Sequence, residues 1–268
     1  MFIETIPRVA ALYRYPLKGF TPEPCEALSV LRSGQVAGDR VLGIRFADTE
    51  APDDAWSRKT GMLALVNTPG LACLRVRFDT ATLRLRIDLN DATLIDAPLD
   101  EQGRRRIADA VADYVLTLNE NPLTDHPERL PLRVVGDGVT PRYHDSEAGE
   151  VTLHGRGSLA ALATALGVAE ISELRFRSNV AVDGLEVMEE QRWVGRKLRV
   201  GSVLFKAVKP KLRCLATHAN PETGKRDLPV LETLTSALGQ EMPIFAIAMA
   251  LGSAPGVITV GDQVELRD

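Results

Sequence analysis

Short apolar segments separated by glycine- and proline-containing turns constrain the fold of this chain most. In residues 71–78 and 83–89, apolar and charged residues alternate, which is typical of strands in a half-exposed hairpin. The other predicted strands are residues 9–16, 26–31, 40–46, 132–135, 179–182, 197–208 and 261–266. Helical spacing is limited to residues 104–116, 158–166 and 228–238. We therefore expect an α+β, β-rich fold with a barrel-like core and a few helices.

A polar connection punctuated by prolines at residues 122–131 is the best candidate for a domain boundary. The chain has 268 residues, which suits one large domain or two small ones. We expect a β-rich amino-terminal subdomain over residues 1–121 and a second, barrel-like domain over residues 122–268.

Charge and cysteine usage exclude several classes of protein. The net charge of −4 gives no basic field for nucleic acid. The three cysteines form no CxxC pair, which favours a reducing, cytoplasmic location. The longest apolar run, residues 244–251, is far shorter than the roughly 20 residues of a membrane span and is expected in the core. The amino terminus lacks a signal pattern, and the four histidines show no zinc-site spacing.

Cys214 lies in the most informative stretch of the chain, KPKLRCLAT, next to Arg213 and close to two lysines. Positive charge near a thiol favours the thiolate, which is a nucleophile and a ligand for soft metals. The alternative is that Cys214 is a buried small apolar residue, as most free cysteines are.

Four segments together resemble the MOSC-domain family, whose members depend on the molybdenum cofactor. The run KLRCLATHANPETG around Cys214 is similar to the cysteine motif of that family. Residues 12–19 (LYRYPLKG), 38–43 (GDRVLG) and 176–184 (FRSNVAVDG) resemble three further family segments, in the expected order. The nearest architecture is that of the mitochondrial amidoxime-reducing component and of bacterial counterparts without a fused ferredoxin domain. The resemblance implies a β-rich MOSC amino-terminal subdomain followed by a MOSC domain.

The resemblance also implies a site for a molybdopterin-type molybdenum cofactor. Cys214 would be the metal ligand and the catalytic residue. A pterin cofactor of this type ends in a phosphate, which arginine binds with a planar fork and lysine with a point charge. Lys18, Arg40, Arg177 and Arg213 lie in the matching segments and are expected to bind it. Gly19 stands where relatives carry serine, so a backbone N–H would replace one hydroxyl.

Two further groups of residues are expected to contact the pterin. The segment 152–158 matches a family segment that touches it, and it contributes His154, Gly155 and Ser158. Ser158 is predicted to cap a helix whose amino terminus attracts anions. Asn179 follows Arg177 by two residues, so both side chains would share one face of a strand.

The reaction implied is the reduction of N-hydroxylated or related N-oxygenated compounds by an oxidoreductase independent of pyridoxal phosphate. Three scattered cysteines cannot hold an iron–sulfur cluster, so we expect a separate ferredoxin-, flavin- or haem-type electron donor. Two alternatives remain open: a sulfur-transfer protein that carries a persulfide on Cys214, and a cofactor-binding module without turnover.

Two other segments are candidate parts of a site. Residues 56–59 would line the substrate mouth or form a surface turn. Tyr143-His144-Asp145 suggests a catalytic dyad, but a strand there would turn the two neighbours to opposite faces.

Overall fold

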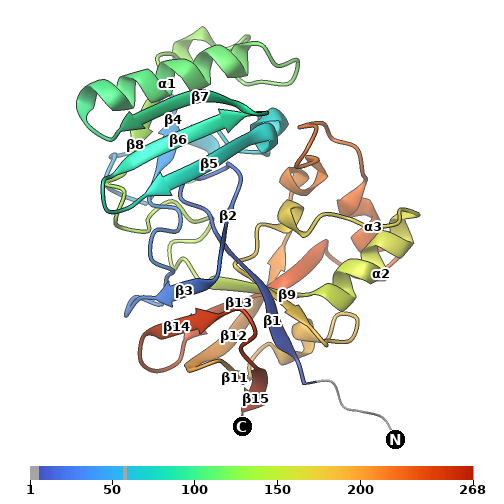
Figure 1. The fold of residues 1–268 in the computed structure, drawn as a ribbon. Coiled ribbons are helices and arrows are strands. Elements are labelled where there is room, and N and C mark those ends of the chain that lie inside the picture. The colour runs from blue at the N-terminus through green and yellow to red at the C-terminus, as the bar shows by residue number, and fades with distance from the viewer. Residues whose placement is uncertain (1–5, 57–58, 268) are drawn as a thin grey trace, which may run out of the picture.

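The computed structural model describes residues 6–56 and 59–267 and contains one large, mostly antiparallel sheet (Figure 1). Only β9 and β10 run parallel to each other. The β-rich fold prediction is confirmed. In sheet order, the strands are β15 (Val264–Arg267), β11 (Lys197–Val200), β12 (Val203–Leu212), β13 (Ile244–Leu251), β9 (Val151–Gly155), β10 (Val180–Asp183), β1 (Arg8–Arg14) and β2 (Glu23–Cys25).

The large sheet curls toward closure because β2 covers only part of β1. β2 pairs with residues 12–14, which leaves the start of β1 free to bond elsewhere. There the Val9 N–H donates to the Asp262 carbonyl at 2.8 Å, and the Val264 N–H donates to Pro7 at 2.9 Å. The segment leading into β15 therefore meets β1, and the sheet is barrel-like around a core that includes Phe205.

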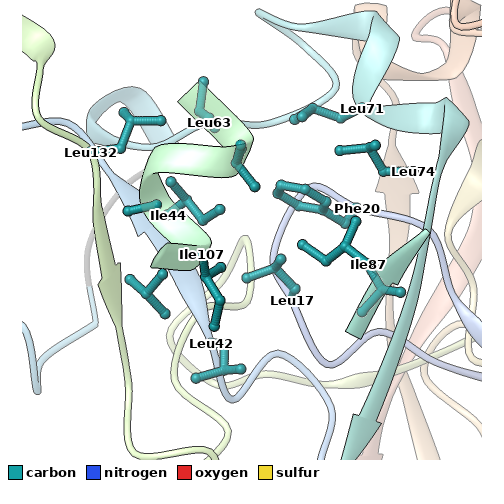
Figure 2. Packing of buried hydrophobic residues seen from close by; sticks show 14 of the residues in the cluster. Leu17, Phe20, Leu42, Ile44, Leu63, Leu71, Leu74, Ile87, Ile107 and Leu132 are labelled. Carbon is teal, nitrogen blue, oxygen red and sulfur yellow. The ribbon is translucent and has the colours of Figure 1, made fainter. Parts of the chain in front are cut away.

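A second lobe is built on the three-stranded sheet β5 (Leu74–Asp79), β6 (Arg84–Leu89) and β7 (Ala92–Pro98), with helix α1 (Glu101–Leu116) packed along it (Figure 1). The predicted hairpin at residues 71–89 is confirmed as β5 and β6. Figure 2 shows the core of this lobe, in which Ile107 of α1 packs with Phe20, Ile44 and Ile87.

The remaining elements connect and cover these two parts. Strand β4 (Gly43–Arg45) pairs with β8 (Arg133–Val135) in the second lobe, and β3 (Ala27–Val30) pairs with β14 (Gly256–Thr259). Helices α2 (Arg156–Leu166) and α3 (Val230–Ser236) lie together beside the large sheet (Figure 1). Short 3-10 helices complete the fold: η1 (Lys59–Gly61), η2 (Pro69–Cys73), η3 (Pro127–Arg129), η4 (Glu173–Phe176), η5 (Glu190–Trp193) and η6 (Leu215–His218).

Two of the strands that the sequence did not predict, β9 and β13, are largely buried. Every residue of β9 is buried, and five of the eight in β13 are. Such strands have no alternation of apolar and polar residues, so the period of two is lost. Residues 197–208, predicted as one strand, instead turn between β11 and β12. The expectation that residues 244–251 pack in the core is confirmed.

Strands from the two sides of the predicted boundary between residues 121 and 122 pair with each other. β1 joins the large sheet through β10, whereas β8 pairs with β4 of the second lobe. The boundary at this point therefore stays a prediction. Within the described residues, the helices lack the combination of length and apolar character that a membrane crossing needs.

Candidate functional site

Two adjoining cavities between the lobes meet at Cys214. The larger has a volume of about 220 Å³ and the smaller about 40 Å³. Cations from distant parts of the chain line both, so the thiol faces a basic cleft. The residues that line both cavities are Arg40, Lys59, Asp145, Arg177, Cys214 and Ala216.

Cys214 lies where β12 gives way to the short helix η6. Its carbonyl accepts a hydrogen bond from the Thr217 N–H at 3.0 Å, which fixes the turn. The buried Arg175 guanidinium holds the same turn by donating to the carbonyls of Thr217 and His218. The thiol is half-buried, and the Lys59 ammonium lies 3.5 Å from its sulfur. The sulfur is therefore held in place beside a cation.

Arg213 is anchored by backbone carbonyls and retains one free donor. Its Nε donates to Phe245 at 2.6 Å and its Nη1 to Phe176 at 2.9 Å. Its Nη2 is buried and has no hydrogen-bond partner in the described part of the chain. Burial lowers the pKa of Arg213 to about 10. A buried donor left without a partner is costly, so an anionic ligand in the cavity would be favoured.

Arg40 and Arg177 converge on one buried aromatic ring. Their guanidinium carbons lie 4.7 and 4.5 Å from the Tyr15 ring centroid, within cation–π range. Arg40 forms an ion pair with Asp39, and Arg177 donates to the Phe20 carbonyl. Burial and the neighbouring Arg40 lower the pKa of Arg177 to about 10. Because the two positive charges repel each other, an anion bound beside them would stabilise both guanidinium groups.

Lys18 and Gly19 line the smaller cavity, as do Arg40 and Arg177. The segment 15–18 runs beside residues 40–42, because the Arg40 N–H donates to Tyr15 and the Lys18 N–H to Leu42. The Lys18 ammonium is buried and donates to Tyr143 at 2.7 Å and to Asp145 at 3.0 Å. This pairing explains how segments 22 residues apart share one site.

Gly19 has a φ of +82°, and a Cβ there would lie 2.6 Å from Ala64 Cα and 2.8 Å from the Leu63 oxygen. That backbone conformation strains any residue with a side chain, and the space for one is absent. The departure from the serine of relatives therefore has a steric reason in this chain.

Asp39 is a buried carboxylate that the sequence reasoning missed as a site residue. Its oxygens accept hydrogen bonds from the Tyr15 N–H at 2.6 Å, His144 Nε2 at 3.2 Å and Asn179 Nδ2 at 3.3 Å, besides the Arg40 pair. Although burial acts to raise it, Arg40 and His144 hold the pKa of Asp39 well below its usual range. Its position beside Arg40 in the segment 38–43 could have identified Asp39 from the sequence.

His144 is oriented by Asp39, not by its sequence neighbour Asp145. A carboxylate can only accept, so Nε2 of the imidazole carries the proton. Its Nδ1 is buried and lacks a partner within the described ranges. The strand assumed for residues 143–145 is absent, and both His144 and Asp145 line the larger cavity. The prediction that a strand would turn His144 and Asp145 to opposite faces was therefore wrong, although the two side chains form no dyad.

Asn179 supports the site without lining either cavity. Its amide oxygen accepts from the N–H and hydroxyl of Thr152, and its amide nitrogen donates to Tyr13 and Asp39. Arg177 ends the short helix η4 with a φ of +53°, and β10 begins only at Val180. The prediction that Arg177 and Asn179 share a strand face was therefore wrong.

Neither cavity is lined by His154, Gly155 or Ser158, although Thr152 of the same segment lines the larger one. His154 is fully buried against Phe245 and lies 3.4 Å from a Glu173 oxygen. Helix α2 begins at Arg156 with Gly155 as its cap, so the prediction that Ser158 caps it was wrong.

The amino terminus of α2 is covered by the chain itself. The Ser158 hydroxyl donates to the fully buried Glu190 carboxylate at 2.9 Å, and a Cβ at Gly155 would lie 3.2 Å from the same oxygen. An internal glutamate side chain therefore occupies the helix terminus that was expected to attract an anion.

Among the residues that line the larger cavity and were not predicted as site residues are Thr152, Lys211 and Thr217. All three lie within segments that were quoted for other residues. Of the predicted mouth segment, Lys59 lines both cavities and the Trp56 indole donates to the His144 carbonyl. Ser57 and Arg58 lie outside the described residues.

The described ranges hold no cluster of three or more histidine, cysteine or acidic side chains that could bind a metal.

In comparisons with known proteins, the second half of the chain matches a protein-family model. Residues 140–265 match the sequence model described as the MOSC domain. Human molybdenum cofactor sulfurase is 29% identical over 94 residues, which are 34% of this chain and 10% of that protein. Mitochondrial amidoxime reducing component 2 of Rattus norvegicus is 35% identical over 99 residues, 33% of this chain and 28% of that protein.

The chain thus spans between a tenth and about a quarter of the length of these curated relatives. Among solved structures, the YUAD protein from Bacillus subtilis has 11% sequence identity and a TM-score of 0.43, with 99% of this chain and 98% of that chain covered.

Proposed function

We propose that this chain, whose residues 140–265 are a MOSC domain, is a molybdenum-cofactor oxidoreductase that reduces N-hydroxylated compounds. The observation that carries the proposal is the position of Cys214, a half-exposed sulfur at the junction of two cation-lined cavities. The named relatives support an association with the molybdenum cofactor.

The donor set fits a pterin cofactor with a terminal phosphate. Lys18, Arg40 and Arg177 around the smaller cavity provide three cations, and Gly19 also lines this cavity. The unpartnered Nη2 of Arg213 adds a donor on the side of the larger cavity. Cys214 would hold the metal through its thiolate, and Lys59 would stabilise the negative sulfur.

When bound, the molybdenum centre would supply the two-electron chemistry of the reduction. The residues of the chain hold the thiol, orient the anion-binding groups and exclude competing contacts. Arg175 fixes the turn after Cys214, and Asp39 orients Arg40 and His144. Asn179 would act only through Asp39 and Thr152. His154, Gly155 and Ser158 are left out of the proposed site because they line neither cavity.

The electrons would come from a separate ferredoxin-, flavin- or haem-type donor protein. The chain has three cysteines, and all three are free and in different parts of the structure. An iron–sulfur cluster needs several cysteine ligands together.

The test compares the wild type with Cys214→Ser and with Cys73→Ser, a half-buried free cysteine that lines neither cavity. Molybdenum is measured by elemental analysis, the pterin by fluorescence after oxidation, and activity by benzamidoxime reduction with an artificial electron donor. We expect Cys214→Ser to lose activity and metal, and Cys73→Ser to keep both.

A molybdenum-loaded wild type that does not reduce benzamidoxime would reject the reductase activity. Full activity of Cys214→Ser would reject the ligand assignment. A persulfide on Cys214 in a protein free of molybdenum would instead favour a sulfur carrier.

A further inference from the structure

Lys211 is a half-buried cation in the larger cavity with no partner in the described part of the chain. It lies three residues before Cys214, near the end of β12. The register between β12 and β13 shifts opposite Lys211, because β13 has two residues between Ile244 and Ile247 where β12 has only Lys211 between Pro210 and Leu212. Such irregularities re-aim side chains next to functional sites. Lys211 and Cys214 thus line the same cavity.

The acidic groups of the larger cavity are already bound to other cations. Asp145 accepts from Lys18, and Glu150 pairs with Lys209 and accepts from Ser146. Burial, followed by the nearby Arg213, lowers the pKa of Lys211. Both effects disfavour the charged form of the Lys211 ammonium group. An anion that enters the cavity would therefore stabilise this group most.

Lys211 stands apart from the cations proposed for the cofactor phosphate. Lys18 lines only the smaller cavity and Arg40 and Arg177 line both, whereas Lys211 lines only the larger one. Three residues of extended chain separate the Cα atoms of Lys211 and Cys214 by at most about 11 Å. A substrate whose N–OH group lies near Cys214 could therefore reach Lys211 with a second group on the far side of one aromatic ring.

We propose that Lys211 makes the site selective for N-hydroxylated substrates that carry a second, anionic group such as a carboxylate. This inference rests on the proposed function and narrows its substrate class. Lys211 would act by binding the remote anion of the substrate and would take no part in the bond cleavage.

The experiment uses the cofactor-loaded full chain and two probes, neutral benzamidoxime and anionic 4-carboxybenzamidoxime. The variant is Lys211→Met, which keeps the aliphatic stem and removes the charge. The control is Lys206→Met, an exposed lysine of the same strand that lines neither cavity. The readouts are KM and kcat for both probes, equilibrium binding of 4-carboxybenzamidoxime by titration calorimetry, and pterin content.

We expect Lys211→Met to raise the KM for 4-carboxybenzamidoxime, relative to that for benzamidoxime, roughly tenfold, the size of one charge-assisted hydrogen bond. Calorimetric affinity for the anionic probe should fall by a similar factor, and pterin content should stay at the wild-type level. Lys206→Met should leave the ratio of KM values unchanged.

An unchanged ratio of KM values in Lys211→Met would overturn the inference. Loss of pterin from this variant would overturn it too, because Lys211 would then hold the cofactor. If the wild type reduces neither probe, the proposed function fails, and the calorimetric comparison alone decides whether Lys211 binds the anion.

Discussion

Replacing Asp39 with asparagine tests whether this buried carboxylate holds the basic cleft together. Asp39 is 1% exposed and accepts hydrogen bonds from Tyr15, His144 and Asn179, besides its ion pair with Arg40. The substituted asparagine could still accept from the Tyr15 N–H through its one oxygen. Its amide nitrogen would face donors, and the Arg40 guanidinium would lose its counter-ion.

The expected loss of stability follows from these contacts. Removing one partner of a buried ion pair costs about 3–5 kcal/mol, because the other charge stays buried without compensation. For a chain of this size, each kcal/mol shifts the melting temperature by roughly 2–4 °C, so Asp39→Asn should melt roughly 10 °C lower. Arg40 would also lose its orientation, so pterin content after purification should fall.

The assay is urea unfolding followed by circular dichroism, with pterin fluorescence measured on the same preparations. Asp96→Asn is the matched control, because Asp96 pairs with Arg84 on the surface, where the two side chains are 34% and 49% exposed. Such a pair contributes about 0–1 kcal/mol. If Asp39→Asn costs no more than Asp96→Asn and keeps its pterin, the role given to Asp39 is wrong.

Two further predictions concern stability. Gly19→Ala should cost more than Gly167→Ala, since both glycines have positive φ values but only Gly19 has backbone atoms within 3 Å of the added Cβ. We expect about 1–2 kcal/mol for the conformation alone and roughly 1–3 kcal/mol more for the collision, measured by urea unfolding; equal costs would contradict the crowding at Gly19. Burial raises the pKa of Glu190, so its contribution to stability is present below the ordinary glutamate pKa and is lost as pH rises through the folded value. Glu190→Gln should therefore flatten the fall in stability above about pH 4.3, and an unchanged pH profile in thermal unfolding would refute this.

Alternation along the sequence predicted the half-exposed hairpin of β5 and β6 and missed the fully buried strand β9. Residues 71–89 formed the expected hairpin because one face of β5 and β6 meets solvent. β9 was missed because all of its residues are buried and leave no period of two. A helix boundary also differed: α2 starts two residues before Ser158 with Gly155 as its cap, and the Ser158 hydroxyl bonds to Glu190, which is distant in sequence.

The sequence by itself determined the chemistry that this chain carries: a cysteine among cations, and lysine and arginine in segments that resemble one family. Residue types and short-range spacing are local properties, so they can be read without coordinates. Only the tertiary structure decided which of these groups meet. The pairing of residues 15–18 with 40–42 brings Lys18 to Arg40, while β12 delivers Lys211 and Cys214 to the same cleft.

Asp39 and His154 show the difference most clearly. Asp39 joins groups up to 140 residues away in the sequence, and His154 lies behind Phe245 instead of in the cleft. Long-range packing sets both positions, and at Asp39 the need to pair a buried charge adds to it. Neither effect is encoded in a residue's near neighbours.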